Sequence, residues 1–511
     1  MKTFNLSVQR LAMLCAAAIL LITTSCSKDN DIDNSIEGSI TGPDMAVYAL
    51  TSNNTLVSFN AKNPSSATKT TSITGLQSNE TILGIDFRPA TGELYGLGSS
   101  SRIYVINTQS GSARAIGAGA FTPAINGTAV GFDFNPTVDR IRLVTSSGQN
   151  LRLHPETGVV AFTDGVLNGA ANASVTAAAY TQNKAGVTTT ELFVIDVAND
   201  KLYKQDPPND GKLVEIGSLG VNVEQAGGFD ISPDGKAALA ALAVGGKTSL
   251  YSINTTTGKA TKIQNDFAGT VTGLAIPTEP VAYAVNEANE LVIFNPMSPS
   301  PVVKPISGIA GGENILGIDF RPVNGQLYAL GSSSRLYTIN TSSGAATAVG
   351  VAPFATLLSG TQFGFDFNPT VDRIRVVSNT GQNLRLNPDN GLLAFVDGQL
   401  SPGSPSVTAA AYTNNFAGAT STVLFDIDTQ NNTLYRQDPP NDGTLVSVGA
   451  LGVTATATNG FDIGSTSGTA YALLNVGGTT KVYTINLTTG AATAGATVTG
   501  NFKAFTLGLG F

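Results

Sequence analysis

Six aspartates stand at one repeated place in the sequence and could form clusters of carboxylates. Each is the third residue of a short apolar segment, as in Gly131-Phe-Asp-Phe-Asn. Converging carboxylates could cleave a glycosidic bond, with one group as acid and the other as base or nucleophile. They could instead bind Ca²⁺, or accept hydrogen bonds from nearby backbone amides and fix the local turn, which is the interpretation that we favour. The six residues are Asp86, Asp133, Asp230, Asp319, Asp366 and Asp462.

Arginines form the second concentration of candidate residues. Arg140 and Arg142 alternate along one expected strand, and Asn150 and Arg152 along the next, so their side chains share one face. Guanidinium groups between packed sheets need acceptors, and Asp133, Asp139 and Gln205–Asp206 are the partners that we expect. The alternative to this polar network is a site for the carboxylate or sulfate groups of a ligand. The candidate ligand-binding residues are Arg140, Arg142, Arg152, Arg373, Arg375 and Arg385.

The chain has few histidine and cysteine residues that could support other kinds of catalysis or metal binding. His154 is the single histidine, and Asn387 occupies the matching place in the second half, so a multi-histidine metal site is excluded. The two cysteines, Cys15 and Cys26, both lie in the N-terminal segment. We therefore expect no catalytic residue and no bound metal or cofactor, apart from Ca²⁺ at the aspartates, and an enzyme is the less favoured class.

The elements that must position these residues are repeated. Gly131–Arg142 recurs unchanged at Gly364–Arg375, 233 residues later. Each copy of this segment has an alternating apolar run, an Asn-Pro turn and a second alternating run, which indicates strand, turn and strand. Ile82–Pro89 recurs unchanged at Ile315–Pro322. The chain is therefore predicted to contain two copies of one domain.

Each copy contains a shorter period, marked by a glycine or alanine that opens a leading strand. These residues are Gly84, Gly131, Ala177, Gly228 and Gly273, then Gly317, Gly364, Ala409, Gly460 and Gly508. Four antiparallel strands in about 45 residues are typical of a propeller blade. In the second unit we expect strands at 82–87, 93–98, 102–107 and 113–117.

The ends of each copy predict how a ring closes. Residues 45–50 and 281–285 begin at a second strand, and the missing first strands are expected at 271–276 and 506–511. We predict an all-β fold with two tandem five-bladed β-propellers, at 45–277 and 278–511, in preference to one ten-bladed ring or a solenoid.

The N-terminus predicts export. Residues 1–25 have a charged start with Lys2 and Arg10 and an apolar core of about a dozen residues, which is typical of a signal peptide. Cys26 follows at the place of a lipidated cysteine, although Thr23 departs from the usual lipobox, and plain secretion is the alternative. Residues 26–44 are polar and are predicted to be a flexible tether. The lipid would be the only membrane attachment.

Composition agrees with short strands and turns and argues against nucleic acid. Only 13% of the 511 residues are charged, and 56 are glycine. Without the signal peptide the chain has 26 basic and 36 acidic residues, so a nucleic-acid partner is not expected.

The Gly131–Arg142 motif, with the Gly-Gln-Asn-Leu-Arg and Asp-Gly signals after it, resembles an uncharacterised bacterial family, domain of unknown function family 4394. The resemblance covers both copies. It implies extracytoplasmic, propeller-like domains and brings no catalytic residues. Our functional interpretation is a lipoprotein of the outer membrane or cell surface, or else a periplasmic or secreted protein, that binds a ligand or partner, for which an envelope polysaccharide or protein is the candidate. The alternative is a carbohydrate-cleaving enzyme that uses the aspartates.

Overall fold

The computed structural model describes residues 38–511, except 128 and 268. The predicted signal peptide, Cys26 and most of the predicted tether lie outside the described residues. The described part holds forty strands and two single-turn 3₁₀ helices. Among its helices, none has the length and apolar character needed to cross a membrane.

The first copy forms five four-stranded antiparallel sheets, called ring 1. The first sheet is β20 (Val271–Ala275), β1 (Ala46–Thr51), β2 (Thr55–Asn60) and β3 (Ala67–Ser72), and the second is β4 (Ile82–Phe87), β5 (Leu94–Gly98), β6 (Arg102–Ile106) and β7 (Ala113–Ile116). The third is β8 (Val130–Asn135), β9 (Arg140–Thr145), β10 (Asn150–Leu153) and β11 (Val160–Thr163). The fourth is β12 (Val175–Tyr180), β13 (Leu192–Asp196), β14 (Lys201–Gln205) and β15 (Leu213–Ser218), with the 3₁₀ turn η1 (Pro208–Asp210), and the fifth is β16 (Gln225–Ile231), β17 (Ala238–Val244), β18 (Lys247–Ile253) and β19 (Ala260–Asp266).

The second copy forms five corresponding sheets, called ring 2. The first is β40 (Phe502–Leu507), β21 (Ala282–Asn286), β22 (Glu290–Phe294) and β23 (Val302–Pro305), and the second is β24 (Ile315–Arg321), β25 (Gln326–Gly331), β26 (Arg335–Ile339) and β27 (Ala346–Val349). The third is β28 (Phe363–Asn368), β29 (Arg373–Ser378), β30 (Asn383–Leu386) and β31 (Leu393–Val396). The fourth is β32 (Val407–Tyr412), β33 (Leu424–Asp428), β34 (Thr433–Gln437) and β35 (Leu445–Ala450), with η2 (Pro440–Asp442), and the fifth is β36 (Ala455–Ile463), β37 (Ala470–Val476), β38 (Thr479–Ile485) and β39 (Ala492–Thr497).

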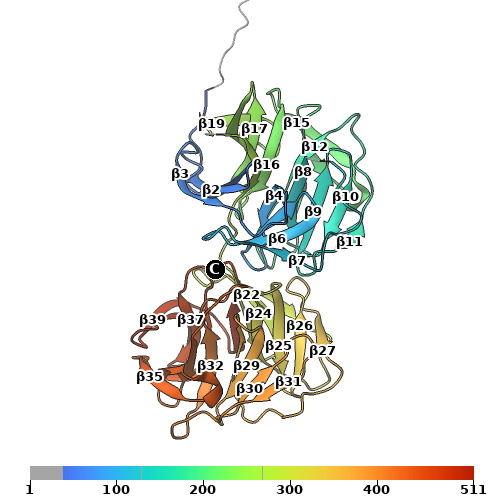
Figure 1. Ribbon diagram of the computed structural model, residues 1–511. Helices are drawn as coiled ribbons and strands as arrows, with labels where there is room; N and C mark the ends of the chain where they lie inside the picture. The colour runs from blue at the N-terminus through green and yellow to red at the C-terminus, as the bar shows by residue number, and fades with distance from the viewer. Residues whose placement is uncertain (1–37, 128, 268) are drawn as a thin grey trace, which may run out of the picture. The chain divides into compact units, whose positions relative to one another are not determined.

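The leading strands of each copy contact one another in cyclic order. In ring 1 the order is β20, β4, β8, β12, β16 and back to β20, and in ring 2 it is β40, β24, β28, β32, β36 and back to β40. Figure 1 shows the blue-to-green strands of the first copy gathered in one group and the yellow-to-red strands of the second in another. The predicted all-β propeller fold in two tandem copies is confirmed.

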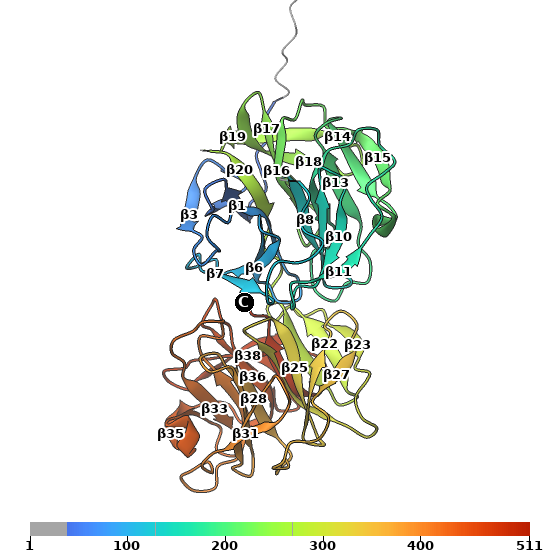
Figure 2. The same ribbon diagram turned by 45° about the vertical axis from the view of Figure 1, so that its right-hand side comes forward.

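The closing strands pair with the opening strands of their own copy. In ring 1, β20 pairs with β1, with Leu274 opposite Ala49, as predicted, and Figure 2 shows the two strands side by side. In ring 2, β40 pairs with β21, with Phe505 opposite Ala284. The prediction of 506–511 for this strand was wrong, because the buried side chains begin at Phe502 and the ladder ends at Leu507.

Hydrophobic side chains fill the spaces between neighbouring sheets. One cluster joins β5 and β6 to the next sheet through Leu97, Ile103, Phe132, Leu143 and Leu151. Burying such faces on both sides of a sheet is the main stabilising contribution in a propeller. The core therefore lies between blades, and each leading strand faces the ring axis at its inner edge.

The glycines that open leading strands are required by close packing at this inner edge. A Cβ atom at Gly131 would lie 2.7 Å from the Cβ atom of Ala178 on the next leading strand. At Gly364 the same contact would be 2.6 Å from Ala410. Small residues at these positions thus let adjacent leading strands approach each other.

Candidate functional site

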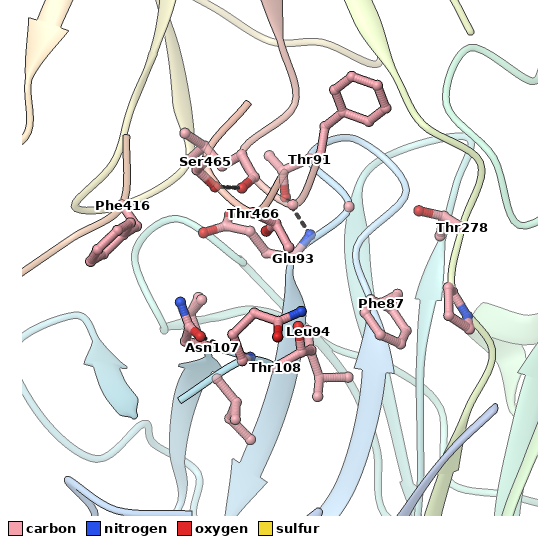
Figure 3. Close-up of a pocket in the computed structure, with 18 of the residues that line it drawn as sticks. Phe87, Thr91, Glu93, Leu94, Asn107, Thr108, Thr278, Phe416, Ser465 and Thr466 are labelled. Carbon is pink, nitrogen blue, oxygen red and sulfur yellow. Dashed lines mark hydrogen bonds between the residues drawn. The ribbon is translucent and has the colours of Figure 1, made fainter. Parts of the chain in front are cut away.

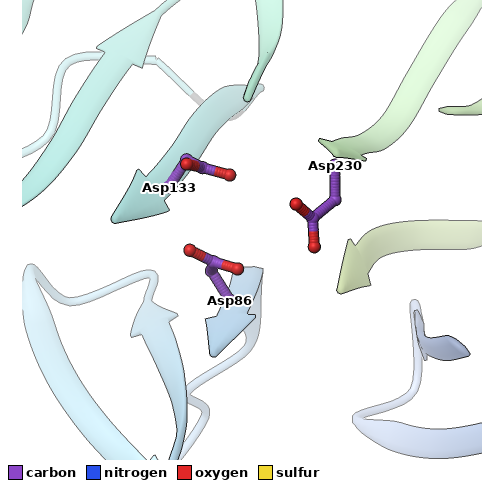
Figure 4. A group of neighbouring side chains, drawn as sticks. All are labelled: Asp86, Asp133 and Asp230. Carbon is purple, nitrogen blue, oxygen red and sulfur yellow. The ribbon is translucent and has the colours of Figure 1, made fainter. Parts of the chain in front are cut away.

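Three aspartates of each copy meet at the centre of their ring. In ring 1 the strands β4, β8 and β16 bring together Asp86, Asp133 and Asp230, and one carboxylate oxygen from each lies within 4.8 Å of the others (Figure 4). In ring 2 the corresponding group is Asp319, Asp366 and Asp462. All six side chains are buried. The sequence pattern therefore located two real clusters.

The aspartates of ring 1 accept hydrogen bonds from amides that face the axis. One amide comes from each leading strand, because the inner edge of that strand has no neighbour in its own sheet. Asp86 accepts from Phe87 and Phe134, each at 2.7 Å, and Asp133 Oδ1 accepts from Tyr180 at 2.9 Å.

Asp230 completes the set by accepting from Ile231 and Ile276, each at 2.6 Å. We call these five donors the inner amides of ring 1: Phe87, Phe134, Tyr180, Ile231 and Ile276.

Two leading strands have alanine where the others have aspartate. Ala179 and Ala275 occupy these places in ring 1, immediately before Tyr180 and Ile276. An aspartate in place of Ala179 would accept the amide of Ile231, and one in place of Ala275 would accept the amide of Phe87. Each amide instead donates to the aspartate just before it in the sequence, which is Asp230 for Ile231 and Asp86 for Phe87. Three carboxylates thus satisfy five amides, which links adjacent leading strands around the axis.

Ring 2 repeats this arrangement with one addition. Asp319 accepts from Phe320 and Phe367, Asp366 from Tyr412, and Asp462 from Ile463 and Leu507. The hydroxyl of Thr506 lies 2.9 Å from both Asp319 Oδ1 and Asp462 Oδ2.

The electrostatics of both clusters favour protons or a balancing cation. Burial, with added repulsion from Asp230, raises the pKa of Asp86 well above its usual value. Burial, followed by repulsion from Asp86 and Asp230, does the same for Asp133. Burial raises the pKa of Asp230 to about 7, against the bonds from Ile276 and Ile231. Three full negative charges at this spacing are costly in a buried site.

Glycoside hydrolysis requires a sugar between two carboxyl groups, with access for water. Asp86, Asp133 and Asp230 are each at most 1% exposed, and five of their six oxygens already accept backbone amides. This geometry does not favour the carbohydrate-cleaving alternative.

Arg142 lies between two sheets with its donors engaged by the chain. It is 1% exposed and bonds to Asn150 and Asp164 in its own sheet, at 2.7 and 2.6 Å. It also reaches Tyr180 and Asn209 of the next sheet, at 3.2 and 2.8 Å. The expected partners Asp133, Asp139 and Gln205–Asp206 are therefore wrong for this guanidinium. Arg375 repeats the arrangement with Asn383, Asp397, Tyr412 and Asn441.

Arg152 pairs with Asp164 through two hydrogen bonds of 2.8 Å and lies over the ring of Phe162. Arg385 does the same with Asp397 and Phe395. Arg140 and Arg373 donate to the carbonyls of Asp139 and Asp372. Of the six arginines, Arg142 and Arg375 thus link two sheets, and the other four bond to groups close to them in their own sheet.

Sequence reasoning missed Asp164 and a further buried arginine, Arg88. Arg88 is 0% exposed and forms a two-bond ion pair with Asp139, with a third contact to Glu156 at 3.0 Å. Arg88 stands inside the repeated Ile82–Pro89 segment, so its recurrence as Arg321 was the available signal. Asp164 recurs as Asp397 in the same way.

His154 takes part in a turn. Its Nδ1 accepts a 3.3 Å hydrogen bond from the amide of Glu156. Burial, and then the nearby charges of Arg140 and Arg88, lower its pKa to about 4, so the ring is neutral at pH 7.

A cavity of about 330 Å³ is lined by loops of both copies (Figure 3). This volume falls in the usual range for small-ligand pockets, about 300–1,000 Å³. The labelled lining residues are Phe87, Thr91, Glu93, Leu94, Asn107, Thr108, Thr278, Phe416, Ser465 and Thr466. Aromatic rings and polar side chains therefore share one cavity, which the sequence did not indicate.

Glu93 is the most unusual residue of this cavity. Its Oε2 atom is buried without a hydrogen-bond partner among the described residues. Burial raises its pKa, while Arg114 and Arg88 act in the opposite direction. In the view of Figure 3, Glu93 lies between Phe416 and Phe87. This oxygen faces packed chain, because a Cβ atom at Gly325 would lie 3.1 Å from it and 2.8 Å from Arg88 Nη1.

Two solved structures are among those that match the chain. One is PorZ, described as an essential bacterial surface component of the type-IX secretion system of Porphyromonas gingivalis, at 15% identity and a TM-score of 0.25 over 90% of this chain. The other is the extracellular domain of the one-component system BT4673 of B. thetaiotaomicron, at 11% identity and a TM-score of 0.26 over 88% of this chain.

The chain spans 59% and 58% of the lengths of these two structures. At TM-scores this low the likeness carries no argument about function. No curated protein matches the chain.

The model of one protein family matches both copies. It is described as a domain of unknown function, DUF4394, and it matches residues 55–275 and 290–507. The two matched segments follow ring 1 and ring 2, and together they cover most of the chain. This protein therefore belongs to the DUF4394 family and carries two tandem copies of its domain.

Proposed function

We propose that this chain is a binding module of the cell envelope, and that the cavity around Glu93 takes a small polar ligand such as a sugar unit of an envelope polysaccharide. The observation that carries the proposal is a cavity of about 330 Å³ that Glu93 lines together with aromatic and hydroxyl side chains. A ligand hydroxyl or ammonium group would donate a hydrogen bond to the Glu93 carboxyl group from the cavity.

The other lining groups fit a ligand with polar edges and an apolar face. Phe416 is 37% exposed and could contact such a face. Asn107, Thr108 and Thr466 add amide and hydroxyl groups to the lining of the cavity. Saccharides combine these two kinds of surface, whereas a purely apolar ligand would leave the polar groups unpaired.

Glu93→Gln tests the proposal, because Gln326 stands at the matching place of the second copy and shows that the fold accepts glutamine there. The probe is a panel of soluble oligosaccharides from bacterial cell walls and capsules, measured by titration calorimetry. We expect at least one member to bind and the variant to bind it about 10–100-fold more weakly. Glu191→Gln, at an exposed ion pair with Lys204, is the control and should bind as the wild type does. Equal binding by Glu93→Gln, or no binding by any member, would contradict the proposal.

The proposed location is the outer membrane or cell surface, with a lipid on Cys26. It is supported by the N-terminal sequence, with its charged start, apolar core and following cysteine. With Cys26→Ser, the protein should leave the membrane fraction and lose labelling by a fatty-acid analogue. Retention of the label in this variant would rule out Cys26 as the anchor.

A further inference from the structure

The carboxylates at the axis of ring 1 offer one oxygen more than the inner amides use. Five of the six oxygens accept the five amides. The sixth, Asp133 Oδ2, is buried and has no hydrogen-bond partner among the described residues. Figure 4 shows the carboxyl group of Asp133 directed toward Asp86 and Asp230. A buried carboxyl oxygen in this setting needs a proton, a donor or a cation.

The two rings differ at one residue beside these carboxylates. Leu507 donates to Asp462 as Ile276 donates to Asp230, so Thr506 and Ala275 are equivalent residues. In ring 2 the Thr506 hydroxyl bridges Asp319 and Asp462. In ring 1 the methyl group of Ala275 cannot bridge Asp86 and Asp230. The axis of ring 1 therefore has the same carboxylates without the hydroxyl.

The ligand set selects the class of ion. It consists of oxygen atoms alone, with no nitrogen or sulfur ligand in the group, which suits a hard cation. Ca²⁺ binds oxygen at about 2.3–2.6 Å, so two ligands on opposite sides of it are about 4.6–5.2 Å apart. The oxygens of ring 1 lie within 4.8 Å of one another, so a single ion could contact all three carboxylates.

We propose that Asp86, Asp133 and Asp230 bind one divalent cation of the Ca²⁺ class at the axis of ring 1, and that the hydroxyl of Thr506 takes its place in ring 2. Each carboxylate oxygen that accepts an amide keeps a second lone pair for the ion. The ion would join three of the five leading strands. It would therefore fix the diameter of ring 1 through the same side chains that satisfy the inner amides.

The test is the calcium content of the full chain, exposed to CaCl₂, passed through a desalting column and measured by mass spectrometry of the elements. We expect one calcium per wild-type chain. Asp133→Asn removes the charge of the unpaired oxygen at nearly constant shape, and Ala275→Thr introduces the hydroxyl found in ring 2. Both variants should bind less than a tenth as much, with circular dichroism spectra like that of the wild type.

Asp366→Asn is the matched control in ring 2 and should keep one calcium. The two variants in ring 1 change different residues, so the test survives if one of them does not fold. A wild-type chain without calcium would overturn the proposal, and so would a folded Asp133→Asn variant that keeps its calcium. Two calcium ions per chain, or the loss of calcium from Asp366→Asn, would contradict the assignment to ring 1.

Discussion

At the scale of single residues, ring 2 has a buried acid, Asp426, that ring 1 lacks. Asp426 on β33 is 0% exposed, and neither of its oxygens has a hydrogen-bond partner among the described residues. Ring 1 has Val194 at the matching place. Burial raises the pKa of Asp426 to about 8, although Arg375 opposes the shift. This carboxyl is therefore protonated at neutral pH.

Asp426 makes the stability of the protein depend on pH. Between pH 4 and pH 8 the folded chain keeps a proton that the unfolded chain has released, so the free energy of unfolding falls by about 1.4 kcal/mol per pH unit as pH rises. Stability from this group is complete below the unfolded pKa near 4 and is lost through the folded pKa of about 8. Asp426→Val should remove this slope and raise stability most at pH 8–9.

The measurement is urea unfolding at pH 5, 7 and 9 for the wild type and Asp426→Val. The residue of ring 1 shows that the same fold accommodates valine at this place. An unchanged difference between the two proteins across the three pH values would show that Asp426 is ionised in the folded state.

At the scale of the strand, the leading strands are constrained by their neighbours. Gly131→Ala should destabilise the protein by about 1–3 kcal/mol, because its Cβ atom would lie 2.7 Å from Ala178 Cβ and 2.8 Å from the Ala178 nitrogen. Gly119→Ala is the control, since a Cβ atom there meets nothing within 4 Å, and its effect should be within about 0.5 kcal/mol. Urea titration gives the free energy of unfolding of each variant. Similar losses for Gly131→Ala and Gly119→Ala would contradict the packing argument.

Strands were the best-predicted feature of the sequence. The four expected strands of the second unit match β4, β5, β6 and β7 to within one residue at each end. Alternation and glycine turns are local, so they are visible in sequence. The closing strand of ring 2 was misplaced because Thr506–Phe511 alternates as well as Phe502–Leu507 does, and only pairing with β21 separates the two.

The candidate sites were predicted less well, for a physical reason. The aspartates could be found because they recur at one strand position, but their amide partners lie on the next leading strand. The pairing of Arg142 with Asn209 depends on how two sheets pack. The cavity around Glu93 is lined by residues as far apart as Tyr48 and Phe511, which no local pattern relates.

At the scale of the whole molecule, each copy depends on a strand from its own far end. β20 completes the sheet that β1 begins, and β40 completes the sheet that β21 begins. All five sheets of each ring therefore have four strands. Such closure removes exposed sheet edges at the axis and ties the first and last segments of each copy together. The positions of the inner amides and of the aspartates follow from this closure.

A disulfide across the closing pair of ring 2 tests this closure most directly. Val285 on β21 lies opposite Ala504 on β40, both are buried, and cysteine is close to each in size. The double variant Val285→Cys with Ala504→Cys should form an intramolecular disulfide, identified by peptide mapping, since the other cysteines are only Cys15 and Cys26. The bond closes a long loop and should raise the free energy of unfolding by up to about 5 kcal/mol over the reduced form. If the oxidised protein shows no link between residues 285 and 504, or links them only between separate chains, ring 2 is not closed by its own last strand.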